Sequence, residues 1–230
     1  ITDTQAPQLV SGLDITGSAR GISSKGGEIA IAGLYALSLI NAGDPLSPSL
    51  TGTWFDTSVP QSNRLYRRVR MEGGRVYLCD SSGGGLYVLG PSLGLIGGLS
   101  PFNAEHIYID GNTGFLSGVR PPSVLSSLEI LNVSDPSNIV ILGSFMEPSV
   151  LYNIKGVEIY EAGGRKYAIM ADGGLRILDV TDPLSPVEVS SLGLTKYSSD
   201  LTLINGIAYI SCGASGFVVV DVRDPVKPET

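Results

Sequence analysis

An Asp-Pro turn motif recurs along this chain at a nearly constant spacing. Clear copies read "NAGDPLSP" at residues 41–48, "NVSDPSNI" at 132–139, "DVTDPLSP" at 179–186 and "DVRDPVKP" at 221–228. Weaker copies are "ITDTQAP" at 1–7 and "VLGPSLG" at 88–94. From position 3 to positions 44, 90, 135, 182 and 224 the intervals are 41, 46, 45, 47 and 42 residues. A fixed period of this length indicates a repeat architecture, so five copies of one structural unit are expected.

Each period contains four short apolar runs of the kind that forms β-strands. In the fourth period these runs are 154–160, 167–171, 175–180 and 187–191, separated by Gly-Gly, Asp-Gly-Gly and Asp-Pro turn signals. No stretch has a sustained 3.6-residue apolar period, so very little helix is expected. Four antiparallel strands per repeat are typical of propeller blades, whereas a β-sandwich would not repeat five times within one chain.

The prolines behind each third strand fit this architecture. Asp182 can accept a hydrogen bond from the backbone of the turn, and Pro183 fixes φ at its first corner. Pro186 then begins an outer strand, where a missing N–H faces solvent and discourages pairing with another chain. The motif is therefore interpreted as a turn that also prevents the outer strand from pairing with another chain, and it is assigned no catalytic or binding role.

We predict an all-β fold, a five-bladed β-propeller with four antiparallel strands per blade, over a single domain spanning residues 1–230. The blades are expected at about 16–56, 64–100, 103–146, 151–192 and 197–224. The chain starts at the turn into a fourth strand and stops just after a third strand. Residues 8–15 are therefore predicted to form an N-terminal strand completing the last blade and latching the ring.

Two stretches also carry a family resemblance. "GGLRILDVTDPLSP" at 173–186, with "KYAIMADGG" overlapping it at 166–174, closely resembles the LVIVD-repeat β-propeller family, and "GFVVVDVRDPVKP" at 216–228 after "AYISCGASG" matches as well. The family occurs in bacterial and archaeal surface and secreted proteins. The resemblance thus implies a propeller fold and an extracellular or cell-surface location in a prokaryote. Because the chain begins at Ile1, either a signal has been removed or the chain has been cut from a larger protein.

The net charge and the apolar stretches exclude some classes of partner, and the positions of the cysteines bear on disulfide formation. The formal net charge of −7 disfavours nucleic acid and anionic membranes, which need a basic face. The longest apolar stretch, 29–43, is too short and too interrupted to insert in a membrane. Cys79 and Cys212 fall at the same position of blades two and five, too far apart for a disulfide, so buried free thiols are expected.

Aligning the five innermost strands gives two sets of candidate channel residues, which alternate in facing along the strands. One set contains Arg20, Arg67, Glu105 and Lys155; the other contains Arg68, His106 and Asp200. Three cations with one carboxylate could hold an anionic ligand at the channel mouth. The alternative is that these groups pair with one another around a water-filled tunnel.

Aromatic residues near the connections between blades give a second set of candidate ligand-binding positions, Trp54, Tyr66, Tyr152 and Tyr197. Such loops bind peptides or sugars in many proteins, although packing between blades is the commoner use of these side chains. The polar connection at 57–64 and the hairpin insert at 119–127 are candidate exposed features.

The sequence therefore predicts a non-catalytic binding or structural module, recognising a ligand at the channel mouth or at the blade-connecting loops. A protein, a glycan or a small anionic ligand is expected as partner, with no cofactor, no metal and no catalytic residue, and the isolated domain is expected to be a monomer. The alternative is a hydrolase or lyase at the channel using His106, Glu105 and Arg67.

Overall fold

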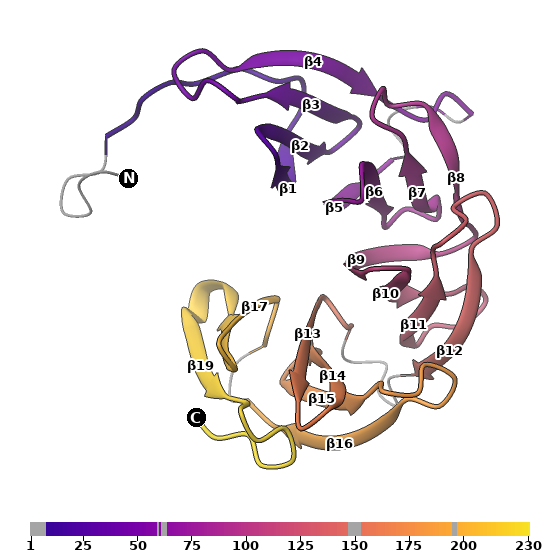
Figure 1. Ribbon diagram of the computed structural model, residues 1–230, viewed down its shortest axis with the longest axis vertical. Helices are drawn as coiled ribbons and strands as arrows, with labels where there is room; N and C mark the ends of the chain where they lie inside the picture. Colours follow the sequence, from indigo (N-terminus) through magenta and orange to yellow (C-terminus); the bar gives the residue numbers. More distant parts are fainter. Residues whose placement is uncertain (1–7, 59, 61–63, 147–152, 195–196) are drawn as a thin grey trace.

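The structure is a computed structural model that describes residues 8–58, 60, 64–146, 153–194 and 197–230. It is built from five antiparallel sheets arranged around a central axis (Figure 1). The described residues contain one short 3₁₀ turn, Gly213–Ser215, and no α-helix. The predicted all-β, five-bladed propeller is confirmed.

The strands follow the order of the chain from the axis outwards. Blade 1 comprises β1 (Ala19–Lys25), β2 (Glu28–Gly33), β3 (Leu37–Asn41) and β4 (Ser49–Trp54). Blade 2 comprises β5 (Tyr66–Glu72), β6 (Arg75–Asp80), β7 (Gly85–Leu89) and β8 (Leu95–Leu99). Blade 3 comprises β9 (Asn103–Asp110), β10 (Thr113–Val119), β11 (Ser126–Asn132) and β12 (Val140–Met146). Blade 4 comprises β13 (Gly156–Ala162), β14 (Arg165–Ala171), β15 (Leu175–Asp179) and β16 (Val187–Leu192). Blade 5 comprises β17 (Asp200–Ile204), β18 (Ile207–Ser211) and β19 (Phe217–Asp221).

The turn interpretation of the Asp-Pro motif is confirmed. Asp182 Oδ1 accepts a hydrogen bond from the Leu184 N–H at 3.0 Å, and its backbone carbonyl accepts one from the Ser185 N–H at 3.1 Å. The same pair of bonds recurs at Asp44, Asp135 and Asp224. Because a carboxylate accepts from the backbone two residues on, it closes the turn between a third strand and the strand that follows.

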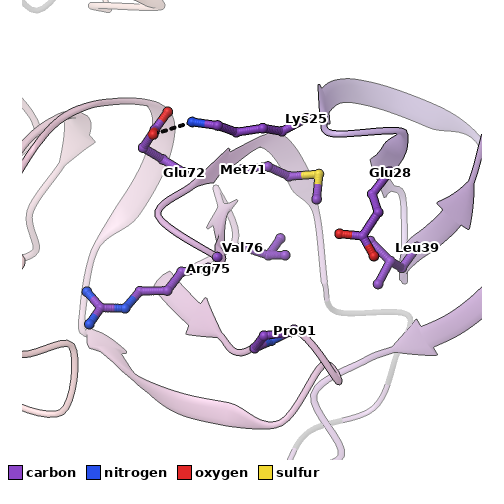
Figure 2. Close-up of a pocket in the computed structure, with 9 residues that line it drawn as sticks. Lys25, Glu28, Leu39, Met71, Glu72, Arg75, Val76 and Pro91 are labelled. Carbon is purple, nitrogen blue, oxygen red and sulfur yellow. Dashed lines mark hydrogen bonds and ion pairs between the residues drawn. The ribbon is translucent and has the colours of Figure 1, made fainter. Parts of the chain in front are cut away.

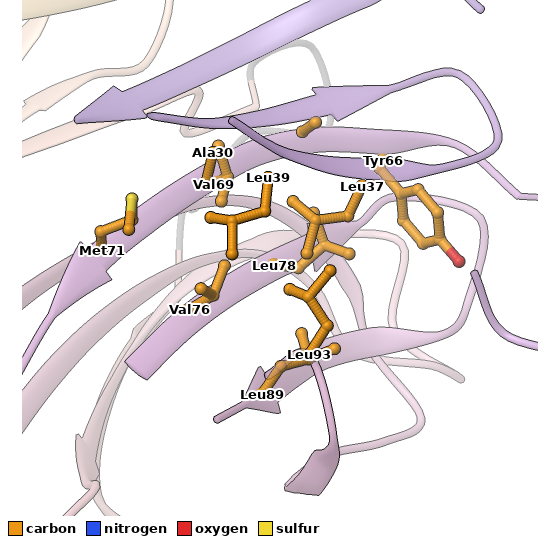
Figure 3. Close-up of a cluster of buried hydrophobic side chains, with 11 residues drawn as sticks. Ala30, Leu37, Leu39, Tyr66, Val69, Met71, Val76, Leu78, Leu89 and Leu93 are labelled. Carbon is orange, nitrogen blue, oxygen red and sulfur yellow. The ribbon is translucent and has the colours of Figure 1, made fainter. Parts of the chain in front are cut away.

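Each pair of neighbouring blades encloses a hydrophobic core between two facing sheets. Figure 3 shows the cluster between blades 1 and 2, where Leu37 and Leu39 of β3 meet Val69 of β5 and Leu78 of β6. Three further clusters fill the spaces between blades 2 and 3, 3 and 4, and 4 and 5. The middle strands are apolar on both faces because both faces are covered, which explains why their sequences read as continuous apolar runs.

The predicted closure of the ring differs from the structure. Among the described residues, 8–15 form no strand, and the fifth sheet has three strands rather than four. Residues 8–15 run along blade 1 instead, where Ser11 Oγ donates a hydrogen bond to the Pro45 carbonyl at 2.6 Å. Figure 1 shows an opening between blades 1 and 5. Strand pairing needs two edges in contact, and the opening keeps residues 8–15 and β19 apart.

Candidate functional site

The first row of predicted channel residues lines one hollow at the inner strands. Its walls are formed by side chains from all five blades: Arg20, Arg67, Arg68, Glu105, Lys155 and Ser199. The cavity has a volume of about 250 Å³ and is open to solvent. The inner strands bring these groups together because equivalent positions of successive blades repeat around one axis.

Two of the four cations in this cavity have acidic partners. Arg67 Nε donates to Ser81 Oγ at 3.0 Å and lies 3.7 Å from Glu105 Oε2, too far for a tight hydrogen bond. Arg68 forms an ion pair with Asp200 of blade 5. Among the described residues the structure records no side-chain partner for Arg20 or Lys155, and both are exposed. The cavity therefore has an excess of positive charge in a chain with net charge −7.

The second row of channel residues does not join this cavity as a unit. Arg68 lines it, Asp200 is engaged by Arg68, and His106 is not among the lining residues. His106 Nδ1 is buried and has no hydrogen-bond partner in the described structure. Burial, reinforced by the charges of Arg68 and Arg70, lowers the pKa of His106 to about 3, so the imidazole is neutral at physiological pH.

A glutamate that the sequence analysis did not select lies in the same polar region. Burial raises the pKa of Glu158 on β13, Arg70 and Arg68 oppose the shift and Asp200 adds to it, which together places the pKa at about 7. The Arg70 guanidinium also stacks over the Tyr108 ring, 5.0 Å from its centroid. Arg70 and Glu158 each follow the residue used to align the inner strands, so extending the alignment by one position would have found them.

The predicted aromatic loop residues divide between packing and exposure. Trp54, Tyr66 and Tyr87 pack together, with ring centroids 5.1–6.3 Å apart, and Tyr66 is fully buried. Tyr66 and the half-buried Trp54 are thus placed as the alternative interpretation expects, in the packing between blades, and their role as ligand-binding positions stays a prediction. Tyr197 is exposed and lines a hollow that shares Lys155 and Ser199 with the channel cavity. Tyr152 lies outside the described residues.

A buried ionic network anchors the same aromatic cluster. Arg64 forms ion pairs with Asp56 and with Asp80, the latter at 2.9 Å, and Tyr87 donates to Asp56 at 2.8 Å. Arg64 and Asp80 are buried. These paired charges hold Asp56, Arg64 and Asp80 together beside the aromatic cluster, so the Arg64 side chain is engaged within the fold.

A smaller hollow of about 100 Å³ opens between blades 1 and 2 (Figure 2). Its floor consists of Leu39, Met71 and Val76, which also belong to the core between these blades. An ion pair between Lys25 and Glu72 crosses its rim, and the hydrogen bond from Lys25 lowers the pKa of Glu72. The hollow is the open end of the interblade core, and Glu28 and Arg75 also line it.

The two cysteines are free and buried, as predicted. Cys79 packs between blades 2 and 3, and Cys212 packs between blades 4 and 5. Burial raises the pKa of the Cys79 thiol, which makes it a poor nucleophile.

No group of three or more His, Cys, Asp and Glu side chains in the described part of the chain is arranged to hold a metal ion. The described ranges also contain no helix with the length and hydropathy needed to span a bilayer.

Comparison with solved structures supports the propeller fold. The yeast protein Sqt1 (Saccharomyces cerevisiae) is 12% identical with a TM-score of 0.68, covering 91% of this chain and 61% of that one. PorZ, a bacterial surface component of the type-IX secretion system of Porphyromonas gingivalis, is 11% identical with a TM-score of 0.65, covering 91% and 33%. BamB from Moraxella catarrhalis is 16% identical with a TM-score of 0.58, covering 90% and 58%. The chain therefore spans less than two thirds of each of these three structures, and at such identities the likeness shows the fold alone.

The comparison with curated proteins found no match. The family model of the LVIVD repeat matches residues 162–193 and 196–229. These ranges cover most of blade 4 and all of the described strands of blade 5. The chain is thus a five-bladed β-propeller that carries LVIVD repeats in its last two blades.

Proposed function

We propose that this protein is a non-catalytic recognition module that binds a small anionic ligand, or a carboxylate or phosphate group of a larger partner, in the channel cavity. The observation that carries the proposal is the convergence of Arg20, Arg67, Arg68 and Lys155 on one cavity, where Glu105 is the only carboxylate among the described lining residues. Arginine can bind a carboxylate or phosphate through two parallel hydrogen bonds, and lysine adds a mobile point charge.

The arrangement of charges supports this proposal over mutual neutralisation. Arg20 and Lys155 have no recorded side-chain partner in the described residues, and the Arg67–Glu105 pair is loose at 3.7 Å. An incoming anion could replace solvent at these cations without breaking a tight ion pair. Attraction in a confined cavity is also screened less than at an open surface.

The hydrolase alternative has less support from the geometry. His106 does not line the cavity with Glu105 and Arg67, and its low pKa makes it a weak base that is not present as the imidazolium acid at neutral pH. The extracellular or cell-surface location is proposed with the recognition role. Its support is the occurrence of LVIVD repeats in such proteins and the likeness in fold to PorZ, a bacterial surface component.

The test is calorimetric titration of the protein with inorganic phosphate, succinate and galacturonate. Binding of at least one anion is expected, weakening as ionic strength rises. Arg67→Ala should weaken it by about ten- to a hundredfold, since a hydrogen bond to a charged group contributes roughly 1.5–3 kcal/mol. Lys227→Ala is the matched control, because it removes one positive charge from the exposed turn of blade 5. No heat with any anion, or equal weakening by both variants, would contradict the proposal.

A further inference from the structure

A second hollow adjoins the channel cavity at the junction between blades 4 and 5. This hollow, named here after Tyr197, has a volume of about 320 Å³ and shares Lys155 and Ser199 with the channel cavity. Its described lining residues belong to blades 4 and 5 and to the connections that lead into them. The inner strands of these blades, β13 and β17, are in contact and lie next to each other around the axis (Figure 1). The Tyr197 hollow therefore extends the channel cavity over the junction of two neighbouring blades.

The Tyr197 hollow differs in chemistry from the channel cavity. Tyr197 is 71% exposed, and Asn153 is exposed as well. They lie two residues before Ser199 and Lys155, which are equivalent positions of the inner row. Apart from Lys155, the described lining residues include no Asp, Glu, Lys or Arg. The hollow thus offers an aromatic ring, an amide and a hydroxyl beside the cations of the channel.

The chain that carries Tyr197 is held in place by its neighbour Ser198. The buried Ser198 hydroxyl donates a hydrogen bond to the Gly174 carbonyl at 2.8 Å and accepts one from the Gly173 N–H at 3.0 Å. These bonds tie the connection before β17 to the turn between β14 and β15. Because the backbone beside Tyr197 is already ordered, a ligand binding there loses little affinity to further ordering of this chain.

The polar groups of the Tyr197 hollow can form hydrogen bonds with a ligand. Within the described ranges no hydrogen-bond partner is recorded for the side chains of Asn153 and Lys155. The amide has two N–H donors and a carbonyl acceptor, and the ammonium has three donors. Ser199 Oγ donates to the Ser211 carbonyl at 3.2 Å and can still accept. Neighbouring hydroxyl groups of a sugar, each both donor and acceptor, match this set.

We propose that the channel cavity and the Tyr197 hollow together bind an acidic saccharide, a chain of sugar units that carry carboxylates. The carboxylate of one unit binds Arg67 and Lys155, so the proposal rests on the proposed function. The C–H face of the next unit packs on the Tyr197 ring, whose negative π-face attracts polarised C–H groups. Its hydroxyls bond to Asn153 and Ser199. Together the two hollows fall within the range of about 300–1,000 Å³ typical of small-molecule sites.

A nucleotide is the competing ligand, since a base could stack on the same ring while its phosphate met the cations. The geometry favours the sugar. Among the described lining residues Tyr197 supplies the only aromatic ring, so the hollow is an open platform rather than a slot that covers both faces of a planar base. Asn153 and Ser199 add hydrogen-bonding groups beside this platform, and a sugar has hydroxyls all around its edge.

The test is calorimetric titration of the protein with galacturonate, digalacturonate and the neutral disaccharide galactobiose. Digalacturonate should bind at least about tenfold more tightly than galacturonate, and galactobiose should give no measurable heat. Tyr197→Ala should weaken digalacturonate binding by about tenfold, and Asn153→Ala by roughly two- to tenfold. Both should leave the binding of the ring-free anions phosphate and succinate unchanged. Tyr209→Ala, which truncates a 40% exposed tyrosine on β18 of the same blade, is the matched control and should change nothing.

The outcomes distinguish this proposal from the proposed function. If simple anions bind but digalacturonate binds no more tightly than galacturonate, the extended site is wrong and anion recognition stands. Equal losses in Tyr197→Ala and Tyr209→Ala would overturn the extended site in the same way. Galactobiose binding as tightly as digalacturonate, or uridine monophosphate binding more tightly, would overturn the acidic saccharide as ligand. The absence of heat with every anion would overturn both proposals together.

Discussion

Blades 4 and 5 are built from the same repeat but have different environments. Both are covered by matches to the LVIVD repeat, and β15 and β19 align residue for residue at "LRILD" and "FVVVD". Ile177 in β15 is fully buried, whereas Val219 at the same position in β19 is 39% exposed. The difference comes from what each side chain packs against: Ile177 lies in the core between blades 4 and 5, whereas Val219 is on the face of β19 that points away from blade 4 and meets no core. Burial in this fold is a property of the neighbouring strand and blade as much as of the repeat itself.

The comparison of blades 4 and 5 predicts its largest effect on stability when the side chain in the middle of the third strand is truncated. Ile177→Ala should lower the free energy of unfolding by about 2–5 kcal/mol, because it leaves a cavity between covered sheets. Val219→Ala should cost less than about 1 kcal/mol in the monomer, since its side chain is already partly in water. Urea unfolding of both variants at low protein concentration measures the difference. Equal losses would mean that β19 is covered in solution.

The junction between fourth strand and turn gives the next prediction. Gly143 approaches the Pro183 carbonyl so closely that a methyl group must displace the backbone. Gly143→Ala should therefore lower the free energy of unfolding by about 1–3 kcal/mol. Ser190→Ala, at the same position in blade 4, removes only its bond to Pro225 and should cost about 1 kcal/mol. Gly193→Ala, with open space around it, is the control, and thermal unfolding of the three variants should rank them in this order.

These contrasts indicate which features could be predicted from the sequence. The Asp-Pro period gave the number of blades, and alignment of the inner strands gave the row of Arg20, Arg67, Glu105 and Lys155 that lines the cavity. Both follow from repetition, which places equivalent residues around one axis. The position of residues 8–15 could not be predicted in this way. Their pattern fits a fourth strand, but pairing depends on how far blades 1 and 5 stand apart, which is set by the packing of all the interblade cores.

The candidate site shows the same limit. The sequence could place Trp54 and Tyr66 near a connection between blades, but not decide between exposure and packing. That outcome depends on Tyr87, which comes from the third strand of blade 2 and stacks against both. Glu158 lies one position beyond the aligned rows, and its raised pKa could not be predicted because it comes from burial in the fold beside groups of blades 2 and 5.

The inner strands of blades 4 and 5 differ at one position in a way that should make stability depend on pH. Glu158 is half-buried, while Thr202 at the same position of blade 5 is exposed. The pKa of Glu158 is raised from 4.5 to about 7 in the folded state, so the folded protein holds this proton more tightly than the unfolded chain. The stabilisation that Glu158 adds to the free energy of unfolding is fully present below about pH 4.5 and is lost as the pH rises towards 7. The loss should be roughly 1–2 kcal/mol, below the upper limit of about 3 kcal/mol for the whole shift, because solvent reaches the group.

Glu158→Gln should abolish this slope in the free energy of unfolding between pH 4.5 and 7, measured by urea titration at several pH values. Glu161→Gln is the control, since this exposed carboxylate lies on the same strand. A slope that persists in Glu158→Gln would assign the titration to another group.

The smallest expected effect concerns the aspartate that ends the third strand of blade 4 and of blade 5. Asp179 accepts a hydrogen bond from the Thr181 N–H at 2.9 Å and forms an ion pair with Arg165. Asp221 accepts a hydrogen bond from the Arg223 N–H at 2.9 Å and also forms an ion pair with the Arg223 side chain. The hydrogen bonds and charge of Arg223 lower the pKa of Asp221 to about 2. The pKa of Asp179 is also lowered, since its bonds to Thr181 and Arg165 outweigh the raising effect of burial. A lowered folded-state pKa stabilises the protein above the unfolded value near 3.8, and this stabilisation is lost as the pH falls towards 2. Asp179→Asn should therefore flatten the acid limb of the thermal unfolding profile more than Asp221→Asn, because the side chain of Asp221 is 34% exposed against 14% for Asp179, so water screens its ion pair more. A larger effect at Asp221 would contradict this difference in screening.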